Sequence, residues 1–200
     1  MMRVVLATNN KGKIRELQAL LMPLQMEVLP KSQFTNDEVA ETGTTFVANA
    51  LIKARHAAQV SGLPAIADDS GIEVDALGGA PGIYSARYAG EHASDADNLY
   101  KLLDAMQSVP DPLRTARYRC ALVYVHSAED DHPLCCEATW EGAIARAPQG
   151  EGGFGYDPIF WLPEYRQTSA QISSTLKNQL SHRAKALQQL LSLLRADQQH

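Results

Sequence analysis

A short apolar run followed at once by a helical pattern opens this chain. Arg3 to Ala7 is predicted to be a buried strand, and Lys11 to Leu21 places apolar residues at the spacing of an amphipathic helix. The polar segment Thr8 to Lys13 is therefore a strand-to-helix turn. Amides at a helix N-terminus can bind an anion because they point outward with the positive end of the helix dipole. An ordinary capped turn with solvated lysines explains this segment equally well.

The composition predicts a globular protein that binds small ligands. The 200 residues fit one domain, or two small lobes that share a cleft. A formal net charge of −5 argues against a general nucleic-acid surface, which usually needs a basic field. The apolar runs are far shorter than the roughly 20 residues that cross a bilayer, and the N-terminus lacks a signal-peptide pattern. We therefore expect a cytoplasmic protein with neither a membrane nor a nucleic acid as partner.

The cysteine pattern indicates neither disulfides nor a zinc site. An odd count, with Cys135 and Cys136 adjacent and Cys120 apart, suits neither a disulfide framework nor a zinc site. We expect all three to be buried and reduced.

A lysine interrupts the apolar stripe of a second predicted helix, from Phe46 to Val60, with Gly62 and Pro64 marking its end. This residue is Lys53. Snorkelling of its long side chain past an apolar rim is the more common explanation. The alternative is a cation that points into a cleft.

Two adjacent aspartates, Asp68 and Asp69, follow the short apolar strand predicted at Ala65 to Ala67. Paired aspartates in a turn are often caps. However, α/β proteins place their ligand-binding sites at strand ends, where these two aspartates are expected. Neighbouring strand residues point to opposite faces, so one aspartate should bind or catalyse while the other supports it.

Two strands of a hairpin are predicted at Arg117 to Val125 and Cys135 to Ala145. Gly150 to Gly155 then matches the dinucleotide fingerprint G-x-G-x-x-G, but Pro158 prevents a helix from opening there, so we reject that reading. We expect a flexible turn that presents the side chains of Phe154, Tyr156 and Asp157.

An arginine falls on the leucine stripe of the last predicted helix, which runs from about Ser174 to Leu194. This residue, Arg183, occupies a position where the spacing favours another leucine. A buried guanidinium must find acceptors because it cannot lose its charge. An internal salt bridge and a ligand acceptor, with His182 beside it, are both consistent with the pattern.

Six segments in order together resemble the inosine triphosphate pyrophosphatase family, the XTP/dITP pyrophosphatases, over nearly the whole chain. Each string alone is weak evidence. The departures are small, with Ala184 where the family often has Gly and Leu180 in place of a common Ile. The segments are TNNKGK from Thr8, ETGTTF from Glu41 with Asn49-Ala50 and Lys53-Ala54, ADDSG from Ala67, GGAPGIYSARY from Gly78, GGFGYDPIF from Gly152, and Ser181-His182-Arg183.

The resemblance implies a two-lobed α/β fold, in which residues 1–200 form a single nucleotide-pyrophosphatase domain. A long mixed central sheet with flanking helices and a cleft between the lobes is expected, usually in a homodimer. The implied reaction is the Mg²⁺-dependent hydrolysis of non-standard purine nucleoside triphosphates. XTP, ITP and dITP would give the monophosphate and pyrophosphate.

The resemblance also implies roles for individual residues. Asp69 would accept the proton of the attacking water and bind the metal, Glu41 would share the Mg²⁺, and Asp68 is a possible helper. Lys13 and Lys53 would face the phosphates. Phe154 offers a stacking face for the purine, and the donors of Arg183 suit a 6-oxo group. The other substrate-binding residues would be Thr8, Asn9, Asn10, Lys11, Gly12, Ser70, Gly155, Tyr156, Asp157, Lys177 and His182.

Two rival functions stay open from the sequence. A Maf-like pyrophosphatase of similar architecture would act on modified pyrimidine or methylated nucleotides, although the Ser181-His182-Arg183 string and the DDSG context count against it. A non-catalytic module that senses purine triphosphates would need the lysines and the base pocket. It would not need Glu41 or Asp69.

Overall fold

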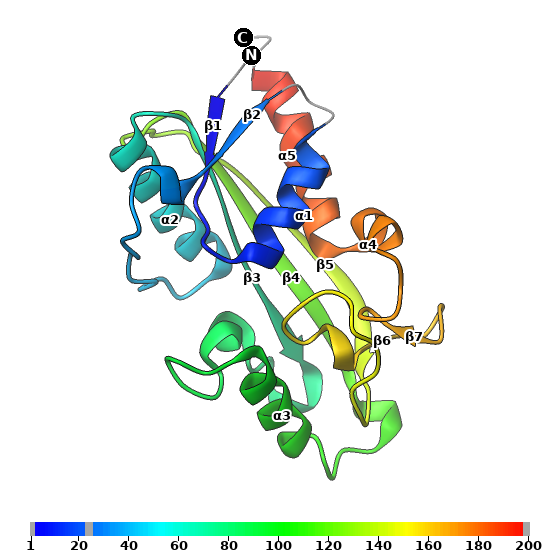
Figure 1. The fold of residues 1–200 in the computed structure, drawn as a ribbon. Helices are drawn as coiled ribbons and strands as arrows, with labels where there is room; N and C mark the ends of the chain where they lie inside the picture. Colours follow the sequence, from blue (N-terminus) through cyan, green and yellow to red (C-terminus); the bar gives the residue numbers. More distant parts are fainter. Residues whose placement is uncertain (1–2, 23–25, 198–200) are drawn as a thin grey trace. The chain divides into compact units, whose positions relative to one another are not determined.

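A mixed sheet with flanking helices forms the framework of the computed structural model, which describes residues 3–22 and 26–197 (Figure 1). The strand order is β2-β1-β3-β4-β5-β6-β7. β1 is parallel to β2 and β3, whereas β6 is antiparallel to β5 and β7. The predicted α/β class with a mixed sheet is confirmed. The strands are β1 (Arg3–Leu6), β2 (Glu27–Pro30), β3 (Ala65–Val74), β4 (Thr115–Val125), β5 (Leu134–Ile144), β6 (Phe160–Leu162) and β7 (Gln167–Thr168).

Two compact units divide the chain. Unit 1 consists of Met1–Asp69, Cys120–Ala138 and Arg183–His200, and unit 2 consists of Ser70–Arg119 and Thr139–His182. Strands β3, β4 and β5 contribute residues to both units. The helices are α1 (Lys11–Leu21), α2 (Phe46–Ser61), α3 (Asp95–Ala105), α4 (Ser174–Leu180) and α5 (His182–Asp197).

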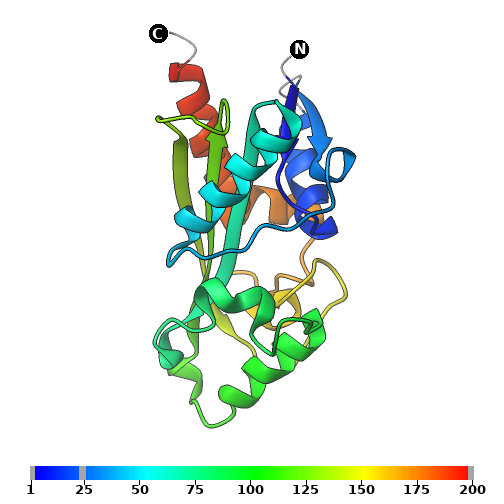
Figure 2. The same ribbon diagram turned by 90° about the vertical axis from the view of Figure 1, so that its left-hand side faces the viewer.

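The core of unit 1 lies between the sheet and two helices. Alternate residues of β1 and β4 join one cluster because side chains along a strand point to one face every second residue. Leu17 and Leu21 of α1 and Leu187, Leu190 and Leu194 of α5 complete this cluster. Helix α2 lies on the opposite side of the strands from α1 and α5, as Figures 1 and 2 both show. The predicted apolar stripes of α1 and α5 are therefore confirmed.

Unit 2 has its own core. Leu99, Leu102 and Met106, along and just after α3, pack in one cluster with buried residues that include Ile72 of β3 and Trp140 of β5 (Figure 2, α3 in green). The helix begins with a capping box between Ser94 and Asp97. No helix of the described residues is long and apolar enough to span a membrane.

The structure corrects the prediction of a short strand that ends at Ala67, before the two aspartates. β3 is continuous from Ala65 to Val74, so both aspartates lie within the strand rather than at its end. β3 lies between β1 and β4 in the sheet. A buried turn there would leave backbone groups without hydrogen-bond partners, which is costly.

The single C-terminal helix predicted from Ser174 to Leu194 is two helices. Ser181 separates α4 from α5 because its backbone is extended, with φ −68° and ψ 157°. The leucine pattern hides the break, since Leu180 and Leu187 are seven residues apart, close to two helical turns.

The prediction of three buried thiols is wrong for one of them. All three cysteines are free, but Cys135 is exposed, whereas Cys120 and Cys136 are buried. Burial raises the pKa of Cys136 to about 11. The strand alternation along β5 explains why adjacent cysteines differ in exposure.

The unit 1 core yields a matched pair of stability predictions on α5. The side chain of Leu190 is 0% exposed and that of Leu193 is 38% exposed. Leu190→Ala should lower the free energy of unfolding by about 2–5 kcal/mol because it leaves a cavity. Leu193→Ala should change it by less than about 0.5 kcal/mol. Urea unfolding measures both, and equal losses would contradict the assigned packing of α5.

Candidate active site

Two adjacent aspartates in the middle of β3 bind different cations within unit 1. Asp68 and Asp69 are only 1% and 5% exposed. An oxygen of Asp68, Oδ2, lies 3.0 Å from Lys13 Nζ, whereas Asp69 Oδ1 lies 2.9 Å from Lys53 Nζ. The predicted separation of the two carboxylates to different partners is confirmed.

Lys53 on α2 joins two carboxylates. Its Nζ lies 2.9 Å from Asp69 Oδ1 and 3.2 Å from Glu41 Oε1. Burial disfavours the charged ammonium, but Asp69, Asp68 and Glu41 outweigh this effect and raise the pKa of Lys53. Lys53 therefore stays charged, and the explanation by snorkelling into solvent is wrong.

Asp69 has the features of a proton acceptor. Burial raises the pKa of its carboxyl, and the nearby ammonium groups of Lys53 and Lys13 only partly oppose this. Its other oxygen, Oδ2, is buried and has no hydrogen-bond partner among the described residues. A carboxylate with a raised pKa and an unpartnered oxygen favours the gain of a proton or a cation.

A second group of charges surrounds Asp68. Arg183 on α5, only 2% exposed, directs Nη2 to Asp68 Oδ2 at 3.4 Å and Nη1 to Glu16 Oε2. Burial would raise the pKa of Asp68, but Lys13, Arg183 and Lys53 hold it well below its usual range. Lys13 and Arg183 thus balance the charges of Asp68 and Glu16. The internal salt bridge considered for Arg183 is therefore present. The role of Arg183 in base recognition stays a prediction.

Glu16 is a member of this network that the sequence patterns did not indicate. It lies three residues after Lys13 on α1, a spacing that places both side chains on one helical face. That spacing was the available signal. The partner Arg183 is too distant in the chain to be found by pattern.

The turn from Thr8 to Lys13 is a capped helix start. The Asn10 side chain accepts hydrogen bonds from the backbone N–H groups of Gly12 and Lys13 at 2.9 and 3.1 Å. Asn9, Asn10 and Lys11 are exposed. The cap is confirmed, but of the two lysines expected in solvent only Lys11 is exposed, because Lys13 pairs with Asp68. Anion binding by this turn stays a prediction.

A buried carboxylate organises the predicted base-binding residues of unit 2. Asp157, 2% exposed, accepts from Lys177 Nζ at 2.6 Å and from the Phe154 N–H at 2.9 Å. It also accepts from Ser169 Oγ at 2.8 Å and Tyr118 OH at 3.1 Å. The Asp157 carboxylate therefore joins four donor groups in one hydrogen-bond network and holds them in place.

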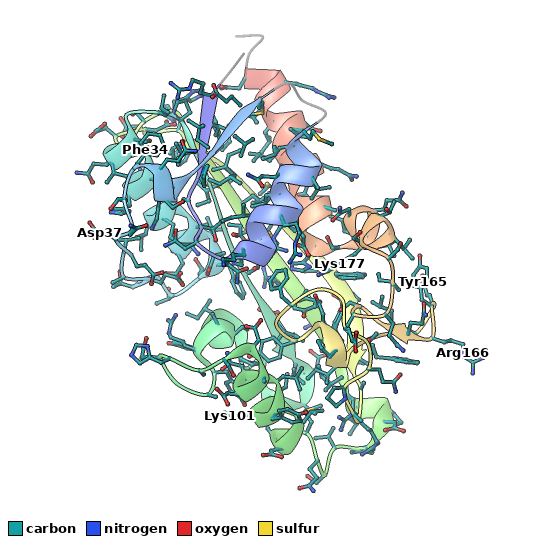
Figure 3. The ribbon with its side chains drawn as sticks, viewed as in Figure 1. Phe34, Asp37, Lys101, Tyr165, Arg166 and Lys177 are labelled. Carbon is teal, nitrogen blue, oxygen red and sulfur yellow. The ribbon has the colours of Figure 1, made fainter. Side chains whose placement is uncertain are left out.

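Phe154 and His182 each have a partner beside their ring. Lys177 Nζ, on α4, lies 5.0 Å from the centre of the Phe154 ring (Figure 3 labels Lys177). His182 stacks on Tyr118 with ring centres 4.6 Å apart and an interplanar angle of 10°. Tyr118 and Ser169 have no sequence signal, because they lie far from Asp157 along the chain.

The flexible turn predicted to present Tyr156 and Asp157 is wrong for these two residues. Tyr156 is 5% exposed and its hydroxyl donates to the Ser85 carbonyl at 2.6 Å. Gly153 has a φ of 70°, and a Cβ at that position would lie 2.0 Å from Asp157 Oδ2. Only glycine allows the chain to fold so closely around Asp157.

The predicted site residues thus fall into two groups, one in each unit. Whether the two groups share a cleft stays a prediction. Unit 1 contains Thr8, Asn9, Asn10, Lys11, Gly12, Lys13, Glu41, Lys53, Asp69 and Arg183. Unit 2 contains Ser70, Phe154, Gly155, Tyr156, Asp157, Lys177 and His182.

Glu41 and Asp69 are the candidate metal ligands. Both bind the same ammonium group, so their carboxylates converge. No group of three or more His, Cys, Asp or Glu residues in the described part of the chain could hold a metal ion. Mg²⁺ is often bound by one or two carboxylates together with water and substrate phosphates, and Glu41 and Asp69 could supply two carboxylates. The buried, unpartnered Oδ2 of Asp69 also fits such an ion.

The comparison with known proteins decides the family. The Ham1 family model matches residues 4–193. The chain belongs to the Ham1 family. Among its relatives, the dITP/XTP pyrophosphatase of Vibrio cholerae is 60% identical over 194 residues, 97% of each chain. The dITP/XTP pyrophosphatase of Escherichia coli O157:H7 is 54% identical over 195 residues, 98% of this chain and 99% of the relative.

Solved structures of other Ham1 proteins share the fold. The HAM1 protein of Coxiella burnetii has a TM-score of 0.89 at 46% identity, and the match covers 98% of this chain and 100% of the Coxiella chain. The Ham1 protein of Staphylococcus aureus has a TM-score of 0.84 at 40% identity, covering 98% and 99%. The family that the sequence resemblance predicted is therefore confirmed.

The buried ion pairs of Arg183 yield a stability prediction for this Ham1 protein. Arg183→Leu would leave Asp68 and Glu16 without this cation, so the free energy of unfolding should fall by about 3–5 kcal/mol at pH 7. Arg195→Leu, at an exposed position of the same helix, should have little effect. Denaturant unfolding measures both.

Unfolding at acid pH tests whether the lost pairing with Asp68 causes the loss of stability. The lowered pKa of Asp68 stabilises the fold above the ordinary value of about 3.9, and this contribution is lost as the pH falls through the folded-state pKa. The difference in the free energy of unfolding between Arg183→Leu and the wild type should therefore become smaller at acid pH. An Arg183→Leu variant as stable as the wild type at pH 7 would contradict the structural role.

Proposed function

We propose that this Ham1 protein hydrolyses non-standard purine nucleoside triphosphates to the monophosphate and pyrophosphate with Mg²⁺. XTP, ITP and dITP are the proposed substrates. The observation that carries the proposal is the convergence of Glu41, Asp69 and Lys53 in unit 1. The names of relatives that are 54% and 60% identical, both dITP/XTP pyrophosphatases, support it.

Asp69 is the proposed proton acceptor. Its raised pKa makes it a stronger base than an exposed carboxylate, and general-base catalysis contributes about 10²- to 10⁴-fold. It would take a proton from water as the water oxygen attacks phosphorus and the phosphoanhydride bond breaks. Glu41 and Asp69 would hold Mg²⁺, which when bound neutralises charge on the pyrophosphate leaving group.

Lys13 and Lys53 are the proposed phosphate ligands. In the free protein Lys13 pairs with Asp68, and Lys53 pairs with Glu41 and Asp69. The phosphates of a nucleotide compete with these carboxylates for the two ammonium groups. Movement of Lys53 to a phosphate would leave its two carboxylates to a divalent cation, so substrate and metal binding would support each other.

Phe154, Lys177 and Arg183 are proposed to bind the purine base. Lys177 Nζ lies over the Phe154 ring, and we propose that this aromatic side chain stacks on the purine. Lys177 and Arg183 carry only donors, which suit the 6-oxo group of hypoxanthine or xanthine and oppose the 6-amino group of adenine. From the family resemblance we further propose a homodimer and a cytoplasmic location.

The proposed function predicts a substrate profile. Purified protein with Mg²⁺ should release pyrophosphate from ITP, XTP and dITP at least about 10-fold more efficiently, in kcat/KM, than from ATP, because one mismatched buried pair costs about 1–3 kcal/mol. GTP is measured in parallel. ³¹P NMR identifies the product, and EDTA should abolish its release.

The other outcomes separate the rival functions. Preferential hydrolysis of modified pyrimidine or methylated nucleotides would indicate a Maf-like enzyme. Tight binding of ITP without hydrolysis would indicate a sensor module. Release of orthophosphate instead of pyrophosphate would contradict the proposed reaction.

A further inference from the structure

The segment that carries Glu41 has little regular structure of its own. Residues 35–45, which precede α2, contain no helix or strand. Two buried polar side chains bind its backbone at separate points. Lys31 Nζ donates to the Asp37 carbonyl at 2.6 Å, and Asn49 Oδ1 accepts from the Gly43 N–H at 2.8 Å (Figure 3 labels Asp37). The orientation of Glu41 therefore depends on anchors outside the segment.

Asn49 is the anchor closer to Glu41. It is 0% exposed, and its amide orientation is determined because the Gly43 N–H can only donate. Its Nδ2 is buried with no hydrogen-bond partner among the described residues. A buried donor without a partner destabilises the fold relative to an apolar side chain, so it needs an explanation. The explanation that we offer is that an asparagine is needed here for its Oδ1, which accepts the hydrogen bond from Gly43.

One face of α2 holds both the backbone and the carboxylate of this segment. Asn49 and Lys53 are four residues apart, so they lie one turn apart on the same helical face. Asn49 binds Gly43, and Lys53 binds Glu41 two residues earlier. The contact at Gly43 is close, because a Cβ there would lie 2.7 Å from both Asn49 Oδ1 and Ala48 Cβ.

We propose that Asn49 is a positioning residue for Glu41 and thereby for the divalent cation. Its amide oxygen fixes the Gly43 backbone, so the Glu41 carboxylate stays beside Asp69 when Lys53 moves to a phosphate. The inference rests on the proposed function, in which Glu41 and Asp69 bind Mg²⁺. Residues that orient a metal ligand typically affect metal affinity by about 10- to 100-fold.

The test measures Mn²⁺ binding to the free protein by electron paramagnetic resonance, and the Mg²⁺ dependence of ITP hydrolysis. Asn49→Ala should weaken Mn²⁺ binding and raise the half-saturating Mg²⁺ concentration by about 10-fold. Turnover at saturating Mg²⁺ should stay within about 3-fold of the wild type, because the amide oxygen of Asn49 binds the Gly43 backbone and would act only through Glu41.

Asn98→Ala is the matched control for loss of a buried asparagine. Asn98 lies in unit 2 and is 3% exposed; its Oδ1 accepts from the Ala89 N–H at 2.7 Å and its Nδ2 donates to the Ala86 carbonyl at 3.0 Å. Its removal should lower the melting temperature at least as much as Asn49→Ala does, because two hydrogen bonds are lost, and it should leave both cation measurements unchanged. A purely structural role for Asn49 predicts that the two variants behave alike.

Asn49→Asp and Gly43→Ala test the contact itself. Asn49→Asp keeps an acceptor at the same place and adds negative charge, so it should bind Mn²⁺ at least as tightly as the wild type. Gly43→Ala should weaken Mn²⁺ binding, since its Cβ would push the segment away from Asn49. These two variants decide the question even if Asn49→Ala does not fold.

Glu41→Gln separates this inference from the proposed function. If Glu41→Gln weakens Mn²⁺ binding but neither Asn49→Ala nor Gly43→Ala does, the positioning role is wrong and the proposed metal site stands. If Glu41→Gln binds Mn²⁺ as the wild type does, Glu41 is not a metal ligand and the proposed site itself fails. Weakening in all three, with Asn98→Ala unchanged, is the expected result.

Discussion

Two buried carboxylates on neighbouring residues of one strand constrain how unit 1 is built. A buried charge is destabilising unless it is paired, so Asp68 and Asp69 each need a cation. Because the two side chains point to opposite faces of β3, the two cations must come from different sides of the sheet. Helix α1 supplies Lys13 and α5 supplies Arg183 to Asp68, whereas α2 supplies Lys53 to Asp69. The alternation of strand residues thus explains why helices on both sides of the sheet carry a cation that pairs with a buried carboxylate.

The two carboxylates differ in what their surroundings allow. Cations outweigh burial at Asp68 and lower its pKa, so it stays ionised as part of a balanced internal network. Burial prevails at Asp69 and raises its pKa, and one of its oxygens lacks a hydrogen-bond partner within the described residues. Asp68 is suited to hold α1 and α5 against the sheet, and Asp69 is suited to accept a proton or bind a cation.

Local patterns in the sequence predicted much of this arrangement. Apolar periodicity located β1, α1 and α2, and strand alternation separated Asp68 from Asp69. Local patterns failed where long-range contacts decide: β3 continues through its polar residues because neighbouring strands pair with it, and Ser181 breaks a helix whose leucine spacing spans the break. The anchoring amide of Asn49 was missed because a loop contact has no periodicity.

The most direct measurement compares Asp69→Asn with Asp68→Asn. Pyrophosphate release from ITP at pH 7 with saturating Mg²⁺ is measured together with the melting temperature. The account predicts that Asp69→Asn lowers turnover by at least about 10²-fold without unfolding the protein, and that Asp68→Asn mainly lowers the melting temperature. Near-normal turnover of Asp69→Asn would contradict it.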